Sequence, residues 1–321
     1  MRVAKKSSLR TKATKFYMNS KPLLTLARAD FHRALLRGVF TLDQNGIPTI
    51  ADPDSDTSIA IARAMLRRVG ETTVRTGVSI QISNKEFQTA VCDFLSSTFL
   101  KLDHLRPGGW EVRDRRSSES VEISNFEQYE HLTKLMEIIE ADAAVAAALG
   151  SDYIITPDVV VLRRPEPEDK LNNTLNVADE ACARLTPLRK INRPDNRTTV
   201  KGKVVEHTTL LLHASVSCKW TLRSDRAQNA RSEALNLIRN RKGRVPHIVA
   251  ITPEPLPSRI ASLALGTSDL DCVYHVALPE LQAAVEDLAK AGRGDQKKDL
   301  ATLVNGKRLR DISDLPLDLA I

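Results

Sequence analysis

Three widely separated residues have the chemistry that cleavage of a phosphodiester bond requires. Asp158 interrupts a run of apolar and β-branched residues, Lys219 lies near the end of an alternating segment, and Glu233 follows fourteen residues later. Metal-assisted cleavage needs carboxylates to hold a divalent cation and a cationic side chain near the attacking water. Each residue alone commonly has a plain structural role, but the three together predict a nuclease centre.

The residues beside Lys219 add oxygen atoms to this centre. Ser217 and Lys219 are two positions apart on a predicted strand, so their side chains project from the same face. Cys218 points the other way, into the core, while its carbonyl oxygen remains available to a cation. A thiol on the buried face of a strand is a poor nucleophile, so we expect only the carbonyl of Cys218 to take part.

A basic segment adjoins the same centre. Residues 219–244 contain eight basic and two acidic side chains. Arg223, Asp225 and Arg226 lie at the start of a predicted helix. Arginine pairs bidentately with guanine, and aspartate accepts from the amino group of cytosine. This cluster therefore predicts recognition of adjacent G·C pairs from a helix N-terminus in the major groove. Glu233 lies seven residues after Arg226, on nearly the same helix face and roughly 10 Å further along.

Strands and helices alternate around these residues, which predicts the α/β class. The segment 207–220 alternates between apolar and polar residues, as a half-buried strand does. The other predicted elements of this half are strands at 153–162 (interrupted by Pro157-Asp158), 245–252 and 272–276, and helices at 226–241 (ending at Gly243) and 278–291.

The N-terminal half is predicted to be mainly helical. Ser83 and Glu86 have the spacing of a capping box at the start of a helix. An apolar stripe follows, formed by Phe87, Val91, Phe94, Leu95, Phe99 and Leu102. We also predict helices over 23–35 and 59–66, a loop over 42–58, short strands at 110–113 and 121–123, and a helix over 126–149.

Composition indicates a globular protein in which the excess charge is local. The chain has 321 residues and a net charge of +7, but eight basic and no acidic residues lie within the first 28, which leaves 7 − 8 = −1 for the rest. We expect a basic N-terminal arm over 1–21, either a plain tail or a phosphate-contacting arm, although an organellar transit segment has similar composition. Residues 22–321 would form one domain with an insertion near 163–206.

Several other classes of protein find no support. No apolar run is long enough to span a bilayer, and no secretory signal is visible, so a cytoplasmic location is the default expectation. The four cysteines are scattered and form no zinc-binding pattern. The motifs HExxH, GxSxG and GxxxxGK[ST] are absent. His213 shares a strand face with Lys219, and a packing role is the better interpretation for it.

The chain resembles the type II restriction endonucleases of the PD-(D/E)XK superfamily, in particular the group that cuts CCGG-centred sites and, within it, the NgoMIV type. The likeness extends from about Pro22 onward, except over 163–206. The segments that carry it are Gly150–Asp158, Leu212–Trp220, Arg223–Glu233, Pro257–Ile260, Val304–Leu309 and Asp311–Pro316.

This resemblance implies a central mixed β-sheet flanked by helices and Mg²⁺-dependent hydrolysis of double-stranded DNA. It implies that Asp158, Glu233 and the Cys218 carbonyl bind the metal and that Lys219 polarises the attacking water. Ser217 stands where the superfamily usually has Asp or Glu, so that Glu233 supplies the missing carboxylate. It also implies a homo-oligomer, dimer or tetramer, that engages two DNA sites within a restriction–modification system.

The resemblance also suggests which residues recognise the DNA sequence. Arg223, Asp225 and Arg226 would recognise the central CCGG. Gln81 and Arg259 match positions that contact the outer base pair, which implies the site GCCGGC. Cleavage would leave four-base 5′ overhangs with 5′-phosphates.

Two positions depart from the family pattern. The family has a further Glu in the helix of the apolar stripe, where this chain has Gln88. Glu86 is nearby, but it lies about 200° around the helix from Gln88. An amide adds no charge, so we expect at most a weakened second metal site. A serine contact of the family falls at Asp54 or Ser55, and both assignments stay open.

Two alternatives to an active nuclease follow from these residues. The first is a sequence-specific DNA-binding protein of the same fold whose catalytic centre has decayed, which Gln88 suggests. The second is a nuclease that recognises DNA structure rather than sequence, and the Arg223–Arg226 cluster argues against it. A plasmid digest with Mg²⁺ discriminates between them.

Overall fold

The computed structural model describes residues 21–74, 80–116, 122–133, 138, 141, 156–179, 181–183, 185–189, 197–200, 203–206, 210–222, 224–266 and 269–321. The predicted arm therefore lies outside the described residues, apart from Lys21. Side chains at 80–83, 197–200, 203–206 and 224–226 are also outside the description.

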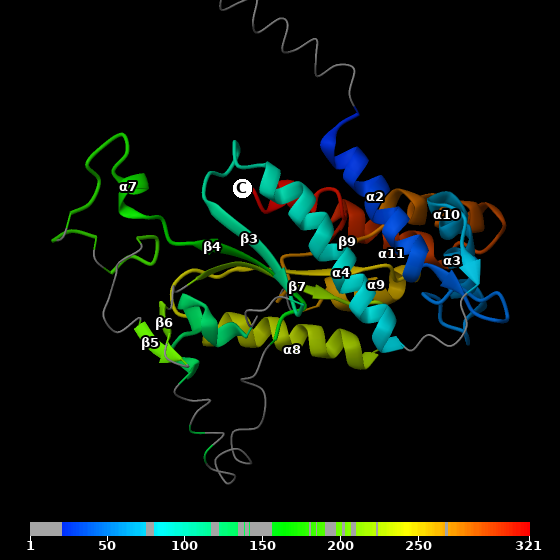
Figure 1. Ribbon diagram of the computed structural model, residues 1–321. Helices are drawn as coiled ribbons and strands as arrows, with labels where there is room; N and C mark the ends of the chain where they lie inside the picture. The colour runs from blue at the N-terminus through cyan, green and yellow to red at the C-terminus, as the bar shows by residue number, and fades with distance from the viewer. Residues whose placement is uncertain are drawn as a thin grey trace, which may run out of the picture.

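A six-stranded mixed sheet forms the centre of the molecule (Figure 1). Its strand order is β10-β9-β8-β7-β4-β3. Strands β7 to β10 pair in parallel, whereas β4 pairs antiparallel with both β7 and β3. The bounds are β3 (Gly109–Asp114), β4 (Val159–Arg164), β7 (Leu211–Cys218), β8 (His247–Thr252), β9 (Cys272–His275) and β10 (Leu309–Asp311). The predicted class, an α/β fold with a mixed sheet, is confirmed.

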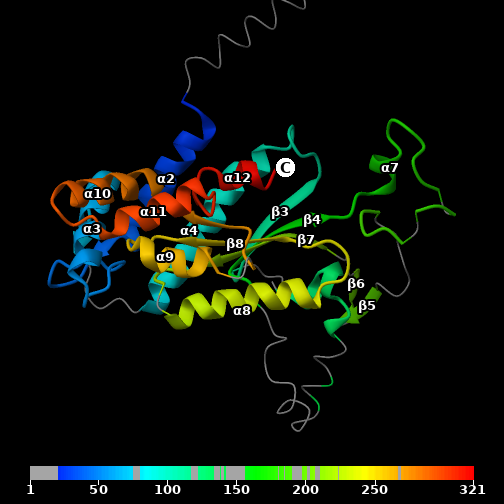
Figure 2. The same ribbon diagram turned by 180° about the vertical axis from the view of Figure 1, so that it is seen from behind.

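Helices cover both faces of this sheet. In Figures 1 and 2, α4 and α8 lie on opposite sides of it, and their N-terminal ends come to the same end of the molecule. The longer helices are α2 (Leu23–Gly38), α3 (Asp56–Val69), α4 (Ile80–Thr98), α8 (Ser224–Asn240), α9 (Pro257–Ala264), α10 (Leu278–Lys290) and α11 (Asp295–Asn305).

The alternation predicted for β7 is present in the structure. Leu212, Ala214, Val216 and Cys218 are buried, whereas Leu211, His213 and Ser217 on the other face are partly exposed; Ser215 on that face is the exception and is buried. The apolar stripe is buried as well, over Phe87–Leu95 in α4 and at Phe99 and Leu102 after the helix ends. Periodicity therefore predicted which faces of these two elements enter the core.

Smaller elements surround the sheet. They are β1 (Thr41–Leu42) paired with β2 (Thr73–Val74), the hairpin of β5 (Arg197–Val200) and β6 (Lys203–Glu206), and the short helices α7 (Glu168–Leu171) and α12 (Leu315–Asp318). The segment around α7 extends away from the body of the molecule (Figure 1). It lies within the predicted insertion, although β4 continues two residues into that range before the chain leaves the sheet.

The capping-box prediction is wrong. Helix α4 begins at Ile80, so Ser83 lies inside the helix rather than at the N-cap position before it, and Glu86 lies beyond the first turn. Ile80 is seven residues before Phe87, which extends the apolar stripe by two helical turns towards the N-terminus.

Two predictions between 121 and 149 are wrong in part. Ile123 opens a 3-10 turn (Ile123–Asn125) instead of a strand, and Phe126 forms a bridge to Leu210 instead of starting a helix. The side-chain amide of Gln128 donates to the Leu212 carbonyl at 2.7 Å and accepts from its N–H at 3.0 Å. These tertiary bonds hold the segment against β7. Most of the predicted helix, from 134 to 149, lies outside the described residues, and so does the start of the strand predicted at 153–162.

Candidate active site

Asp158 lies at the start of β4, where it faces the end of β7. Val159 pairs with Val216, so Asp158 is brought beside the last residues of β7. Its Oδ2 accepts the N–H of Cys218 at 2.8 Å, and its Oδ1 accepts the side-chain amide of Gln88 at 2.6 Å. Two donors from different elements therefore fix the orientation of this carboxylate.

Lys219, directly after β7, is in contact with Glu233 on α8. The Lys219 Nζ lies 3.5 Å from Glu233 Oε2, and the hydroxyl of Ser217 lies 3.5 Å from the same oxygen. The backbone N–H of Lys219 donates to Ile251 at 2.9 Å, which continues the β7–β8 ladder and keeps Lys219 on the face of Ser217. The Lys219 side chain is 15% exposed and that of Glu233 is 45% exposed, so the pair opens towards solvent.

Small residues on α8 allow Glu233 to reach the sheet. Ala230 and Ala234, which flank it by three positions and one position, are each 1% exposed, and so is Leu237. Alanine side chains let the helix axis approach the sheet closely. Asp158, Ser217 and Glu233 consequently line one small pocket between α8, β4 and β7.

Burial dominates the electrostatics of Asp158 and raises the pKa of its carboxyl above the ordinary value. The nearby Lys219 ammonium and the Cys218 N–H oppose this shift, and the Glu233 carboxylate adds to it. The residues that lie around Asp158 therefore also determine how readily its carboxyl ionises. A cation near both carboxylates would remove the repulsion between them.

The donor set is compatible with a hard divalent cation. Among the described residues, no group of three or more His, Cys, Asp or Glu side chains gathers at one point. Asp158 and Glu233 are nonetheless two carboxylates that line one pocket, which Ser217 also lines, with its hydroxyl 3.5 Å from Glu233 Oε2. Mg²⁺ binds through one or two carboxylates and keeps several waters, so oxygen donors of this number and type fit that ion.

Gln88 contacts the centre through its amide nitrogen. The predicted position on α4 is therefore brought to the site, but it donates a hydrogen bond to Asp158 instead of presenting a negative charge. Arg115, which the sequence did not single out, adds a positive charge that acts on Asp158. It follows β3 in a turn, and no periodic pattern marks it.

The predicted DNA contacts are described only in part. Gln81 lies in the first turn of α4, and Asp225 and Arg226 lie in the first turn of α8, but their side chains are outside the described part; Arg223 is outside it altogether. Arg259 lies in the first turn of α9.

Arg259 forms an ion pair with Asp52, in the loop before α3. The same loop carries both alternatives at 54 and 55. Ser55 is the N-cap of α3 and accepts the N–H of Ser58 at 3.2 Å, whereas Asp54 is exposed. Asp52, which the sequence did not single out, thus joins two segments for which DNA contacts are predicted.

His213 has a structural role, as predicted. Its Nε2 lies 2.8 Å from the carbonyl oxygen of Leu319, and its ring stacks on Phe99 with a centroid separation of 5.9 Å. Burial lowers the pKa of His213 to about 3. Burial also raises the pKa of the Cys218 thiol well above its ordinary value, which agrees with a thiol that does not act as a nucleophile.

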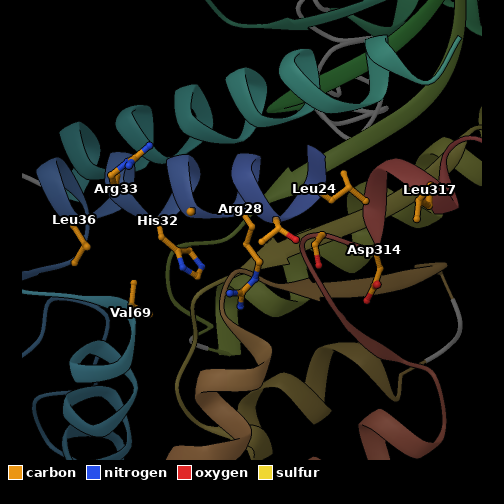
Figure 3. A pocket seen from close by; sticks show the side chains of 11 residues that line it. Leu24, Arg28, His32, Arg33, Leu36, Val69, Asp314 and Leu317 are labelled. Carbon is orange, nitrogen blue, oxygen red and sulfur yellow. The ribbon is translucent and has the colours of Figure 1, made fainter. Parts of the chain in front are cut away.

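A separate pocket lies beside α2, away from these residues (Figure 3). Its lining includes Leu24, Arg28, His32 and Asp314, none of which is among the predicted site residues. Arg28 is held in ion pairs with Glu280 at 2.5 Å and with Asp311 at 2.8 Å. This arginine therefore joins α2 to α10 and β10.

The mixed sheet, with an acid at the start of β4 and a lysine at the end of β7, defines the restriction endonuclease-like class of α/β nucleases. A model of the NgoMIV restriction enzyme family matches residues 31–321. The chain is also 45% identical over 301 residues to the type II restriction enzyme NgoMIV of Neisseria gonorrhoeae. The matched region covers 94% of this chain and 99% of that protein.

The chain therefore belongs to the NgoMIV restriction enzyme family, and its enzyme class is that of the type II restriction endonucleases. Enzymes of this class generally need a divalent metal ion. None of the described helices combines the length and the apolar character that crossing a membrane requires.

Proposed function

We propose that this chain is a Mg²⁺-dependent endonuclease that hydrolyses double-stranded DNA at a CCGG-centred palindrome, with GCCGGC as the expected site. The products would carry 5′-phosphates and four-base 5′ overhangs. The observation that carries the proposal is the convergence of Asp158, Lys219 and Glu233 from three different parts of the fold: Asp158 and Glu233 line one pocket, and Lys219 Nζ lies 3.5 Å from Glu233 Oε2. Family membership supports the reaction class.

In this proposal Asp158, Glu233 and the Cys218 carbonyl hold the cation. When bound, the cation supplies charge neutralisation at the phosphate and activates water for attack on phosphorus. Lys219 orients the attacking water and stabilises the negative charge that develops in the transition state. Glu233 keeps the Lys219 ammonium directed at the pocket through the 3.5 Å contact.

Sequence recognition is assigned to two further segments. Arg223, Asp225 and Arg226 would recognise the central base pairs, since Arg suits guanine and Asp suits cytosine. Gln81 and Arg259 would recognise the outer pair. The ion pair with Asp52 supports the second assignment, because it restrains the Arg259 guanidinium before DNA is bound.

The loop that holds Arg259 provides a further candidate contact. Ser55 caps α3 with its hydroxyl, whereas Asp54 is exposed. Asp54 is therefore the better candidate of the two for a contact with DNA. An acidic side chain there would pair with a cytosine amino group or be repelled by a phosphate.

The proposed partners are double-stranded DNA and further copies of this chain, as a dimer or tetramer that engages two sites. The enzyme would act in the cytoplasm beside a methyltransferase that protects the host sites. Residues 22–321 would form one endonuclease domain with an insertion near 163–206. Light scattering of the protein with and without a GCCGGC duplex measures the oligomeric state.

The testing experiment is a plasmid digest with Mg²⁺ that compares the wild type with the Lys219→Ala variant. Lys297→Ala is the matched control, because it also removes a lysine from a Lys–Glu pair, here 2.7 Å apart, and neither member is among the proposed site residues. Discrete fragments from the wild type and the control, but not from Lys219→Ala, are expected. Sequencing the cut ends tests Gln81 and Arg259, since random outer base pairs would contradict their assignment.

One observation favours a second candidate function. Gln88 is uncharged, and its amide occupies one oxygen of Asp158. A sequence-specific DNA-binding protein with a decayed centre would bind the GCCGGC duplex but give no Mg²⁺-dependent cutting in the same digest. Such binding without cleavage would replace the nuclease proposal.

A further inference from the structure

Glu254 is a completely buried acid for which the proposed reaction has no role. It lies between β8 and α9 in Pro253-Glu254-Pro255, and its side chain is 0% exposed. Within the described residues its carboxylate is held by backbone N–H groups and not by a cationic side chain. An acid in such surroundings must be strongly fixed by its partners.

The two oxygens of this carboxylate bond two different segments. Oε2 accepts the N–H of Leu222 at 2.9 Å, and Oε1 accepts the N–H of Leu256 at 3.2 Å. Leu222 lies in the connection between β7 and α8, two residues before α8 begins. Leu256 is the N-cap residue of α9, three residues before Arg259.

Each of these segments leads directly to a proposed DNA contact. The connection that contains Leu222 continues into Arg223 and the first turn of α8, and α9 presents Arg259 in its first turn. A single carboxylate therefore fixes the entry of both helices. The side chain of the α9 N-cap residue makes no hydrogen bond; Glu254 accepts the N–H of this N-cap residue, and the N–H of Ser258 in the first turn donates to Gln296.

The backbone of Glu254 is itself restrained. Its N–H donates to the hydroxyl of the fully buried Thr252 at 3.1 Å, and its carbonyl oxygen lies 3.2 Å from Nε2 of His275. Nδ1 of the same imidazole accepts the N–H of Ala277 at 3.0 Å, so Nε2 carries the proton that the Glu254 carbonyl accepts. The carboxylate is thus mounted on the central sheet.

We propose that Glu254 is a positioning residue for sequence recognition, which holds the start of α8 and the start of α9 in the one relative placement that matches the DNA site. This inference rests on the proposed function, because it takes the residues at 223–226 and Arg259 as base contacts. Loss of the carboxylate would loosen both segments together, and recognition of central and outer base pairs would weaken in parallel.

The charged state of Glu254 gives this arrangement a dependence on pH. Burial raises the pKa of Glu254 to about 7, and the negative charge of Asp52 also raises this pKa. The two backbone N–H groups and the more distant Arg259 lower the pKa and so oppose the shift. His275 faces its backbone carbonyl. The ionised carboxylate accepts from both N–H groups with full strength, whereas protonation weakens one of the two bonds.

The test uses the full chain with Lys219→Ala, which prevents cutting, and compares Glu254 with Glu254→Gln. The amide is isosteric, but its NH₂ group would face a backbone N–H and break one bond. Glu166→Gln is the control for loss of a buried carboxylate elsewhere in the fold: Glu166 (6% exposed) accepts the backbone N–H of Gly109 beyond the far end of β4, and it also pairs with Arg163 and Lys170. Equilibrium binding is measured for a GCCGGC duplex and for duplexes altered at an outer or a central base pair.

The expected result is that Glu254→Gln lowers discrimination against both altered duplexes at least tenfold, while Glu166→Gln changes neither. The parent protein, which carries only Lys219→Ala, should also discriminate better at pH 8 than at pH 6. In the protein that also carries Glu254→Gln, discrimination should not depend on pH in this way. If the parent discriminates well but is unaffected by both the substitution and pH, the role of Glu254 is refuted. If the parent does not discriminate at all, the proposed recognition residues are refuted, and this inference with them.

Discussion

Replacing Gln88 by Glu changes one charge beside Asp158 without changing the size of the side chain. The amide N–H that donates to Asp158 Oδ1 at 2.6 Å would become a carboxylate oxygen that faces another carboxylate. Without a divalent cation the variant should be less stable than the wild type. With one, the added carboxylate should strengthen cation binding, so that stability returns.

The size of the effect follows from the contact. Two unit charges at about 4 Å repel by about 4 kcal/mol at an effective dielectric constant of about 20. Loss of the hydrogen bond adds about 1 kcal/mol, and proton uptake by one carboxyl limits the total. We expect a loss of about 2–4 kcal/mol without cation, which for a chain of 321 residues corresponds to a melting temperature lower by roughly 3–6 °C.

The assay is thermal unfolding in EDTA and across a Mg²⁺ titration, which reports cation binding without reference to activity. Gln128→Glu is the matched control, because the Gln128 side-chain amide is also hydrogen-bonded, but to the backbone of Leu212 in β7 and not to Asp158. The control should lose stability by a similar amount and regain none of it with Mg²⁺. A Mg²⁺ response of Gln88→Glu equal to that of the wild type would mean that position 88 does not face the cation.

Three further predictions concern catalysis, pH and stability. Lys219→Ala should slow single-turnover cleavage at least about 10²-fold while binding to the GCCGGC duplex stays within threefold of the wild type; cleavage at the wild-type rate would remove Lys219 from the centre. For Glu254, the pKa in the folded state, about 7, exceeds the ordinary 4.5, so its contribution to stability is full below about 4.5 and is lost as pH rises through 7. Urea unfolding measures the free energy of unfolding at pH 5 and at pH 8. Between these two pH values the wild type should lose up to about 3 kcal/mol more stability than Glu254→Gln. Equal losses in the two proteins would contradict the shifted pKa. Arg28→Met should lower the free energy of unfolding by about 2–4 kcal/mol, since Glu280 and Asp311 would face each other without their shared cation; a loss below about 0.5 kcal/mol in urea unfolding would show that the cluster is not coupled to folding.

Elements with a strong hydrophobic period could be predicted from the sequence, because the period alone determines which face is buried. The alternation in β7 and the stripe of α4 are the best examples, and both are present as expected. The start of α4 differs from the prediction: the polar pattern at Ser83 favours a cap there, whereas the helix already begins at Ile80. A cap is worth only about 1 kcal/mol, so a local pattern of this kind is a weak guide to where a helix begins.

Segments whose conformation depends on distant partners could not be predicted. Ile123 and Phe126 have the residue types of a strand and a helix, but Gln128 replaces a neighbouring strand by bonding both backbone groups of Leu212. Nothing within the segment 121–130 indicates this partner, which lies 84 residues away. Long-range hydrogen bonds of a single side chain leave no period in the sequence.

In the candidate site, too, local strand geometry could be predicted from the sequence, whereas contacts between distant residues could not. Ser217 and Lys219 were placed on one face by strand geometry, and the structure agrees. The pair of Arg259 with Asp52 spans 207 residues and was not anticipated. Glu254 did leave a local signal, an acid between two prolines directly after a strand, similar to Pro157-Asp158 before β4. A charged residue at such a point of an otherwise buried run indicates that the fold has fixed partners for it.

The connection from β7 to α8 explains why cutting and recognition are expected to respond together. Lys219 ends the β7–β8 ladder, Trp220 packs its ring on Phe87 of α4 at 5.9 Å, and Leu222 is bonded by Glu254. Leu222, whose N–H bond to Glu254 fixes the start of α8, is only three positions after the proposed catalytic Lys219. A DNA duplex that fits the helix ends badly would therefore strain the same short segment that places Lys219. Discrimination should consequently appear in the cleavage step as well as in binding, because the connection is too short and too well anchored for the two to move independently.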